Sequence, residues 1–422
     1  MTERASRSRP ALFTNGQALA ALGYRNYRLY FVGQFISMIG TWVQGVAQGW
    51  LVWRLTQSEF AVGMVTAFGS APMLLLSLVG GTVADRVDRR RLLLVTQSLA
   101  MFLAALLGYL SLLPGLQVWH VAAVAACLGA VSAFDVPTRQ AFVVQMVDRG
   151  ALMNAIALNS MLFNGARVVG PAVASVLIAI PWIGVPGCFF VNSASYMAAL
   201  TALVKIRVAS GEPFSSESSP VALVLGGVRY VIAMPLLRRL ITLLFVVGVF
   251  GWSGSVLMPA MAEKVLHGGA GTYGGLMTAA GVGAVAGALI LASLGDTPHR
   301  RRLVFGGLAL VCAALLGFSL SSWIPLSMVA IGLFGMGMIL FFATSNTVVQ
   351  TIVPDELRGR VMGVWALVFA GSTPIGSLMA GAIARQWGAP AAIQVGVLAM
   401  AVCGALIYRQ SRRERAQQVT GG

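Results

Sequence analysis

The sequence of 422 residues is poor in charge, and above all in acidic charge. Charged residues make up 10% of the chain, whereas soluble domains have about 25%, and only 13 residues are Asp or Glu. Hydrophobic residues, by contrast, make up 58% of it. Because so little polar surface could not cover a globule of this size, a water-soluble globular protein is excluded. We expect lipid to surround most of the chain.

Residues that carry catalysis or bind metals are also scarce. The four cysteines lie far apart within apolar runs, and the three histidines lie at the edges of such runs, so neither a disulfide framework nor a metal site is expected. The sequence contains no Gly-Lys-Ser/Thr phosphate-binding loop, so we do not expect this chain to hydrolyse ATP. We therefore expect no cofactor, no bound metal and no enzymatic activity.

Twelve apolar runs are present instead, each long enough to cross the roughly 30 Å hydrocarbon core of a bilayer as a helix. The first six are Tyr30–Trp53, Ala61–Val83, Leu93–Leu113, Trp119–Phe142, Leu152–Ile180 and Val185–Leu203. The second six are Leu240–Met261, Tyr273–Leu294, Leu303–Leu320, Ile324–Val348, Val361–Ala384 and Ala391–Tyr408. The sequence therefore predicts an all-α membrane protein of 12 transmembrane helices in two six-helix bundles.

A polar, turn-rich stretch, Ala209–Pro220, separates the two sets of runs. The following run, Val221–Leu237, is amphipathic and is expected to lie along the cytoplasmic surface. The expected divisions are an N-terminal segment at 1–28, a bundle at 29–204, a linker at 205–238, a second bundle at 239–408 and a basic tail at 409–422.

The positions of Lys and Arg predict the orientation in the membrane. With a cytoplasmic N-terminus, 25 of the 29 basic residues fall on the cytoplasmic side. The external loops then hold only Arg54, Lys264 and Arg385, and Arg167 lies within a span. This asymmetry is the positive-inside rule, so both termini are predicted to lie in the cytoplasm and the chain in the cytoplasmic (inner) membrane. The net charge of +16 is expected to face anionic lipid headgroups rather than nucleic acid, because the basic residues lie in short groups between apolar runs.

The two halves of the chain repeat. After the second run, Asp85 is followed by Arg89-Arg90-Arg91-Leu92, and after the eighth run Asp296 is followed by Arg300-Arg301-Arg302-Leu303. The two loops share one offset of 211 residues. A duplicated six-helix unit is typical of secondary transporters, in which the substrate site lies between the two repeats.

The segment Gly81–Arg91 resembles the signature loop of the major facilitator superfamily, Gly-x-x-x-Asp-Arg-x-Gly-Arg-Arg/Lys, with Asp88 in place of the second glycine. The glycine at the start of this segment is expected to let two helices approach closely. The resemblance implies that the loop closes the cytoplasmic side when the protein faces outward. The residues to which it assigns this gating role are Gly81, Asp85, Arg86, Arg89 and Arg90.

The fifth run is similar in spacing to the antiporter motif of the same superfamily. Ala and Ser replace several of its glycines, and Gly170 and Pro171 are retained. In the family this motif marks exporters, so the resemblance favours export. The segments Phe134–Gln140 and Asp355–Val361 are also similar to the enterobactin-exporter branch, to which macrolide-efflux proteins are assigned.

Polar residues inside predicted spans are costly in lipid and therefore point to function. Asp135 is the only carboxylate well inside a span, and Arg139 follows one helical turn later. They form either a structural or gating pair or a proton-accepting site for antiport. Arg167 either has a structural partner or anchors an anionic or polar substrate. The predicted substrate cavity comprises Gln34, Thr41, Gln44, Gln48, Asn164, Arg167, Trp252 and Asn346.

The glutamines of the first run follow a helical spacing, so they share one face with Thr41. They either contact substrate or form hydrogen bonds between helices. From all these features we expect a proton-coupled exporter of a small molecule, either a siderophore or a drug-like compound, that works by alternating access. Its expected partners are the substrate, protons and membrane lipid. The alternatives are a nutrient importer of the same fold, a lipid translocase and a membrane scaffold without transport activity.

Overall fold

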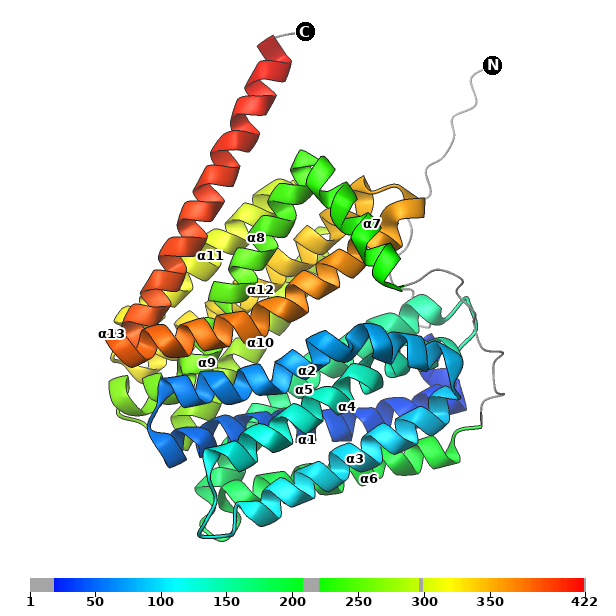
Figure 1. Ribbon diagram of the computed structural model, residues 1–422, viewed down its shortest axis with the longest axis vertical. Helices are drawn as coiled ribbons and strands as arrows, with labels where there is room; N and C mark the ends of the chain where they lie inside the picture. The colour runs from blue at the N-terminus through cyan, green and yellow to red at the C-terminus, as the bar shows by residue number, and fades with distance from the viewer. Residues whose placement is uncertain (1–18, 208–219, 296–298, 421–422) are drawn as a thin grey trace.

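The computed structural model describes residues 19–207, 220–295 and 299–420. Within these ranges every regular element is helical and no strand occurs, which confirms the all-α prediction (Figure 1). The predicted repeat residue Asp296, most of the predicted N-terminal segment and the polar part of the linker lie outside the described residues.

The first half begins with a short 3-10 turn, η1 (Ala20–Gly23), and continues with six long helices. These helices lie where the first six apolar runs were predicted. They are α1 (Arg25–Thr56), α2 (Glu59–Arg86), α3 (Arg89–Leu110), α4 (Val118–Val144), α5 (Leu152–Ala179) and α6 (Gly184–Lys205).

The second half begins with helix α7 (Pro220–Ala233), which packs along α13 and α8. The run predicted at Leu240–Met261 is divided among three elements. Its elements are α8 (Pro235–Gly251), α9 (Ser253–Ala260) and a single π-helical turn, η2 (Met261–Val265). The remaining helices are α10 (Ala270–Leu294), α11 (Arg300–Leu320), α12 (Ile324–Ile352) and α13 (Asp355–Thr420).

Helix α13 consists of two helices joined at Gly388, where φ is 83° and the backbone leaves the helical region. The last two predicted runs lie on either side of this glycine. Ten helices of the described chain are long and apolar enough to cross a membrane, with residues 355–410 of α13 counted as one. The polar first helix α1 is not among the ten. Twelve crossings and two cytoplasmic termini therefore stay predictions.

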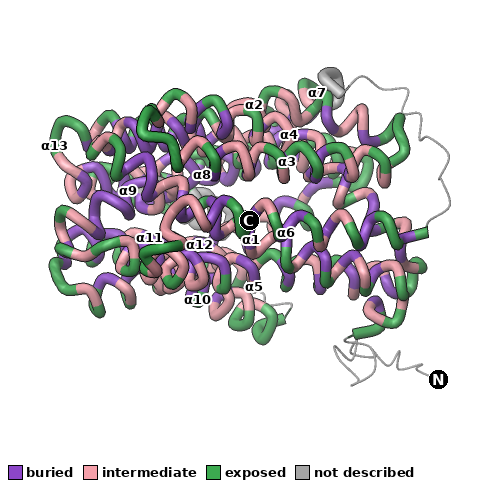
Figure 2. Tube along the Cα trace, turned by 90° about the horizontal axis from the view of Figure 1, so that it is seen from below, coloured by how far each residue is buried: buried purple, intermediate pink, exposed green. Residues whose placement is uncertain are grey.

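The helices form two bodies, one from each half of the chain, which Figure 1 shows as a lower body in blue to green and an upper body in green to red. The halves meet mainly through two helix pairs, α2 with α13 and α5 with α10. The long helices each carry both buried and exposed residues (Figure 2). Large apolar side chains such as Leu75, Met153 and Leu289 are exposed on the outside, as expected of surfaces that contact lipid.

Small residues allow the two interface pairs to approach closely. A side chain at Gly63 of α2 would collide with the backbone of Ser377 in α13, and one at Gly274 of α10 would collide with Ser175 of α5. Such contacts are typical of membrane helices, in which small residues replace the hydrophobic effect as the basis of association. The substrate path expected between the halves is therefore bounded on two sides by tightly packed helices.

Candidate functional site

The interior of the first half contains a hydrogen-bonded cluster around Asp135 of α4, which is only 6% exposed. Its Oδ1 atom accepts hydrogen bonds from Thr96 Oγ1 at 2.9 Å and Gln97 Nε2 at 2.8 Å, both on α3. Its Oδ2 atom lies 2.6 Å from Nε of Arg139, so Asp135 and Arg139 form an ion pair. The direction of the Nε–H bond does not meet the geometry of a hydrogen bond. The pairing that the spacing suggested is therefore present. Both carboxylate oxygens have partners, as a buried charge requires.

A cavity of about 60 Å³ adjoins this cluster. It is lined by Asp135 and Arg139 of α4, by Thr41 of α1 and by Tyr196 of α6. The hydroxyl oxygens of Thr41 and Tyr196 lie 3.5 Å apart. The cavity is polar and large enough to hold water, and water in it would connect the carboxylate to the α1 and α6 hydroxyls.

The polar face of α1 divides between two environments. Gln34 and Gln44 are buried within the first half, and Gln44 Oε1 accepts a hydrogen bond of 2.6 Å from Asn192 Nδ2 of α6. Of the two roles considered for Gln44, the structure shows the helix-to-helix hydrogen bond. Gln48 instead lines a cavity of about 140 Å³ between the halves, where residues of α1 and α2 face Tyr273 and others of α9 and α10.

Arg167 of α5 lies between two indole rings that come from different halves of the chain. Its guanidinium carbon is 5.9 Å from the ring centroid of Trp42 in α1 and 5.6 Å from that of Trp252, at the junction of α8 and α9. Among the described residues Arg167 forms no ion pair, and the indole Nε1 atoms of both tryptophans are buried without a hydrogen-bond partner. A cation therefore lies close to two indole rings, one from each half, whose N–H groups have no described partner.

Asn164 and Asn346 do not join this group by any described contact. Asn164 donates a hydrogen bond of 2.9 Å to the Ser160 carbonyl oxygen of its own helix, and Asn346 accepts one of 2.6 Å from Gln350 in α12. Both side chains are half-buried. Their place in the substrate cavity stays a prediction.

The predicted gating loop makes its described contacts within the first half. Arg89 lies 3.7 Å from Asp85 and donates hydrogen bonds to the carbonyl oxygens of Ala84 and Ala141. Arg90 donates to carbonyl oxygens at the end of α6, where a cation also complements the helix dipole. Asp85 and Arg86 are exposed.

The structure revises one prediction for this loop and gives a role to the residue that replaces its second glycine. A side chain at Gly81 would meet nothing within 4 Å, so the expectation that Gly81 permits close helix approach was wrong. The neighbouring Gly80 has that role, because a side chain there would collide with the backbone of Ala133 in α4. Asp88, which replaces the usual glycine of the motif, caps α3 by accepting a hydrogen bond of 2.7 Å from the Arg91 backbone N–H.

Gly170 and Pro171 lie where α5 packs against helices of both halves. A side chain at Gly170 would collide with Trp42 of α1, and the Pro171 carbonyl oxygen lies beside Gly274 of α10. The two residues thus help to position α5, which carries Arg167, against its neighbours.

A group of residues that the sequence patterns did not indicate joins the halves at the face opposite the gating loop. Lys264 Nζ of η2 donates a hydrogen bond of 2.7 Å to Oε1 of Glu59, which is 7% exposed at the start of α2. The same ammonium lies 4.8 Å from the ring centroid of Trp53, whose indole N–H donates to Glu263. Trp50 and Tyr273 stack nearby, with centroids 6.1 Å apart. A signal was available, because Lys264 is one of the few basic residues predicted on the external side and has an acidic neighbour.

Residues 16–419 match the sequence pattern of the transmembrane secretion effector family. The chain belongs to this family of the major facilitator superfamily. The staphyloferrin A transporter of Staphylococcus aureus is 25% identical over 364 residues, which cover 86% of this chain and 90% of that protein. The multidrug efflux pump Tap of Mycolicibacterium fortuitum is 26% identical over 374 residues, with the same coverage. The enterobactin exporter EntS of Shigella flexneri is 26% identical over 392 residues, 90% of each chain.

Solved structures of other transporters share the fold. A bacterial homologue of the human lysosomal transporter Spinster, in an inward-facing and unoccupied conformation, has a TM-score of 0.73 and 13% identity, covering 95% of this chain and 98% of that one. The nucleoside transporter NupG has a TM-score of 0.75 and 9% identity, covering 91% and 98%. The predicted family is therefore confirmed, and the chain is a multi-pass transporter of the cytoplasmic membrane with relatives named for siderophore transport and for drug efflux.

Proposed function

We propose that this transporter is a proton-coupled exporter of a small anionic or polar molecule and that it works by alternating access. The observation that carries the proposal is the buried Asp135–Arg139 pair, an ion pair within one half that adjoins a polar cavity. A second observation supports it, because Arg167 lies between the halves, where a substrate would be held.

Protonation of Asp135 is expected to disturb the whole cluster. A neutral carboxyl would leave the Arg139 guanidinium without its counter-charge, and loss of one partner of a buried ion pair typically costs about 3–5 kcal/mol. That cost favours a state in which Arg139 has moved or the cluster has opened to water. A proton that binds at this site would therefore change the relative stability of two conformations of the first half, which is the requirement for coupling.

The places where the two halves touch support alternating access. Glu59, Lys264 and Trp53 join the halves at one face, while the contacts of Asp85 and Arg89 at the opposite face stay within the first half. With the orientation that the basic residues predict, this arrangement corresponds to a state closed to the outside. The opposite state would need the contact at Glu59 to break and the gating loop to engage the second half.

The environment of Arg167 favours an anionic or electron-rich substrate. The guanidinium and the two indole N–H groups are donors without a described hydrogen-bond acceptor, and the indole rings offer flat apolar surfaces. Siderophores carry carboxylates or catecholates, which match these donors, and two of the relatives are named for siderophores. We therefore place siderophores ahead of amphipathic drugs as the substrate class.

Transport into everted membrane vesicles tests the proposal. The vesicles are prepared from a host without its own siderophore exporters and are given staphyloferrin A, enterobactin or ethidium. We expect accumulation of at least one probe, driven by an imposed pH gradient and abolished by nigericin. Accumulation only in right-side-out vesicles would overturn the direction, and accumulation unaffected by nigericin would overturn proton coupling.

The Asp135→Asn variant tests whether the pH-driven accumulation depends on the Asp135–Arg139 pair. It is expected to lose accumulation driven by the pH gradient while it still exchanges labelled for unlabelled substrate. Ser132→Ala is the matched control, because Ser132 lines the same cavity and its hydroxyl donates only to a carbonyl of its own helix. If the two variants respond equally to the pH gradient, Asp135 is not the proton site.

A further inference from the structure

The carboxyl group of Asp135 has two kinds of neighbour in the interior of the first half. On one side lies the Arg139 guanidinium, which can only donate hydrogen bonds. On the other side lie Thr96 and Gln97 of α3, whose side chains can both donate and accept. Thr96 and Gln97 are only 4% and 3% exposed, so bulk water does not take their place. These neighbours therefore determine which oxygen of Asp135 is able to hold a proton.

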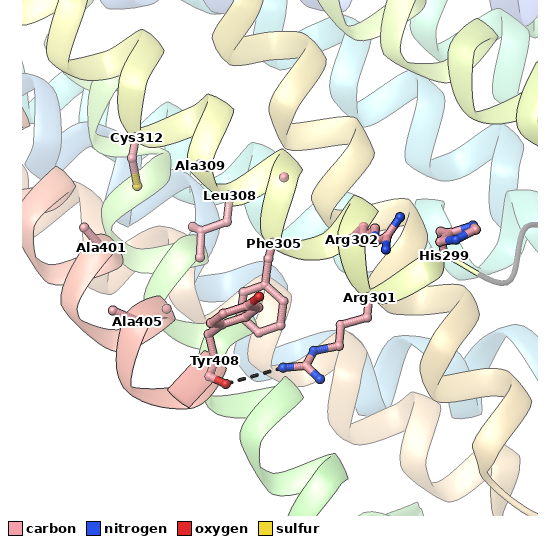
Figure 3. Close-up of a pocket in the computed structure, with 12 residues that line it drawn as sticks. His299, Arg301, Arg302, Phe305, Leu308, Ala309, Cys312, Ala401, Ala405 and Tyr408 are labelled. Carbon is pink, nitrogen blue, oxygen red and sulfur yellow. Dashed lines mark hydrogen bonds between the residues drawn. The ribbon is translucent and has the colours of Figure 1, made fainter. Parts of the chain in front are cut away.

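Asp135 also differs from the groups that line two larger cavities of the described chain. Neither the cavity of about 140 Å³ between the halves nor a cleft of about 970 Å³ between α11 and the last part of α13 has a carboxylate in its lining. Figure 3 shows this cleft, with two arginines and His299 at one end and mostly apolar side chains along the rest. The way in which a carboxyl group beside a cavity holds a proton is therefore a question about Asp135 and its own neighbours.

The Thr96 hydroxyl has two acceptors within reach but only one hydrogen. Its Oγ1 atom lies 2.9 Å from Asp135 Oδ1 and 3.2 Å from the carbonyl oxygen of Leu93, one turn earlier in α3. Both separations meet the geometry of a hydrogen bond, and a hydroxyl group can satisfy only one of them at a time. While Asp135 is ionised, the bond to Oδ1 is the stronger because its acceptor is charged. The Leu93 carbonyl oxygen then stays available as a second position for the same hydrogen.

The two oxygens of Asp135 are not equivalent as places for a proton. Oδ2 lies 2.6 Å from Arg139 Nε, and a guanidinium cannot accept a hydrogen bond from a protonated oxygen. Oδ1 lies 2.9 Å from Thr96 Oγ1, which becomes an acceptor once its own hydrogen turns to the Leu93 carbonyl oxygen. Gln97 Nε2, at 2.8 Å, can continue to donate to Oδ1, because a protonated oxygen keeps acceptor capacity. Gln97 would have to turn over its amide to accept, whereas Thr96 needs only to rotate its hydroxyl group.

We propose, on the basis of the role proposed for Asp135 in proton coupling, that Thr96 is a positioning residue that holds the proton on Oδ1 of Asp135. When the proton binds, Oδ1–H donates to Thr96 Oγ1 and the Thr96 hydroxyl donates to the Leu93 carbonyl oxygen. The contacts of α3 with the carboxyl group are then satisfied in both protonation states. Arg139 keeps an uncharged oxygen as its neighbour and loses its counter-charge. The response to the proton is thereby directed to Arg139 on α4 and not to α3.

The other titratable groups near the pair do not compete for this proton. Tyr30 of α1 and Tyr196 of α6 are close enough to interact electrostatically with both Asp135 and Arg139. A tyrosine in water titrates near pH 10, so both phenols stay uncharged near neutral pH. The described contacts of α3 with Asp135 come from the uncharged Thr96 and Gln97. Thr96 therefore acts by its hydrogen bond and not by charge.

Infrared difference spectroscopy of the purified full chain, between acidic and neutral pH, tests the role of Thr96. The carbonyl stretching band of protonated Asp135 is identified as the band that Asp135→Asn lacks. Thr96→Val keeps the shape of the side chain without the hydroxyl group, and it should shift this band to higher frequency, because a carboxyl group whose O–H donates no hydrogen bond absorbs there. Thr96→Ser keeps a hydroxyl group and should leave the band in place. Thr96→Ala replaces Thr96→Val if the latter is not monodisperse in size-exclusion chromatography.

Thr138→Val is the matched control, because Thr138 is fully buried on α4 and its hydroxyl donates to a carbonyl oxygen of its own helix. If the band depends on Asp135 but stays in place in Thr96→Val, or if Thr138→Val shifts it equally, Thr96 does not hold the proton and the role of Asp135 is unaffected. A spectrum without any band that depends on Asp135 would refute the proton site itself. A shift in Thr96→Val that Thr96→Ser does not show would support the assignment of the proton to Oδ1.

Discussion

Glu59→Gln is expected to open the external face of the transporter. Glu59 of α2 is 7% exposed, and its carboxylate accepts the hydrogen bond from Lys264 that joins the two halves. A fully buried pair that loses one partner costs about 3–5 kcal/mol, whereas exposed pairs contribute about 0–1 kcal/mol. Because the Lys264 side chain is 50% exposed, the expected loss lies between these values, at roughly 1–2 kcal/mol. A loss of that size shifts the equilibrium between closed and open states roughly 5- to 30-fold.

Electron paramagnetic resonance distances across the external face measure this shift. Spin labels at Leu55 of α1 and Gly271 of α10 suit the measurement, because both positions are exposed and a side chain at Gly271 would meet nothing within 4 Å. All four native cysteines are replaced first. The longer distances should gain population in Glu59→Gln and in Lys264→Gln.

The double variant with both glutamines should shift the distances by less than the sum of the two single variants, since both substitutions act on one interaction and the double variant leaves no unpaired charge. Asp355→Asn is the control, because it removes an exposed ion pair with Arg358 within one helix. If Glu59→Gln leaves the distance distribution unchanged, or if Asp355→Asn shifts it equally, the contact does not hold the external face closed.

Two further predictions concern packing and substrate binding. Gly80→Val should reduce the melting temperature and the yield of folded protein, because overpacking against the Ala133 backbone costs about 1–3 kcal/mol. Gly81→Val is the control and should be tolerated, because a side chain there would meet nothing within 4 Å. If scanning fluorimetry gives Gly81→Val the lower melting temperature, the role of Gly80 is contradicted. Arg167→Gln should raise the KM for an anionic probe at least tenfold with a smaller effect on ethidium, measured in everted vesicles, and equal effects on both would remove Arg167 from substrate recognition.

The fold was predictable because its signals are local. A run of about twenty apolar residues must form a helix in lipid, so each predicted run has a helical counterpart among the described residues. The division of one run at Trp252 was not predicted, although Gly251, Gly254 and Pro259 lie around the junction and are weak helix formers. The pair of Asp135 and Arg139 was also predictable, because both residues lie on one helix, four positions apart.

Contacts between distant segments could not be predicted in this way. Gln44 faces α6 because Asn192, 148 residues away, offers it a hydrogen bond. Glu59 and Lys264 are 205 residues apart, and nothing near either residue in the sequence identifies its partner. The periodicity of α1 showed that its glutamines share a face, but it could not show which helix covers each of them.

Helix α1 is in a position to connect the proton site with the substrate site. Thr41 lines the cavity beside Asp135, and the next residue, Trp42, packs on the Arg167 guanidinium. Neighbouring residues of a helix point about 100° apart, so a rotation or shift of α1 that alters one contact must alter the other. Substrate binding at Arg167 should therefore release protons from detergent-solubilised transporter.

Trp42→Ala should abolish that proton release, measured in a weakly buffered solution. In this variant Asp135 should still bind and release protons when a pH gradient is imposed on vesicles. Trp119→Ala is the control, since Trp119 is exposed at the start of α4. Proton release that persists in Trp42→Ala would mean that the two sites communicate by another route. If both variants lose proton release, the cause is general destabilisation of the protein. If only Trp42→Ala loses it, α1 is the helix through which a proton bound in the first half affects a substrate held between the two halves.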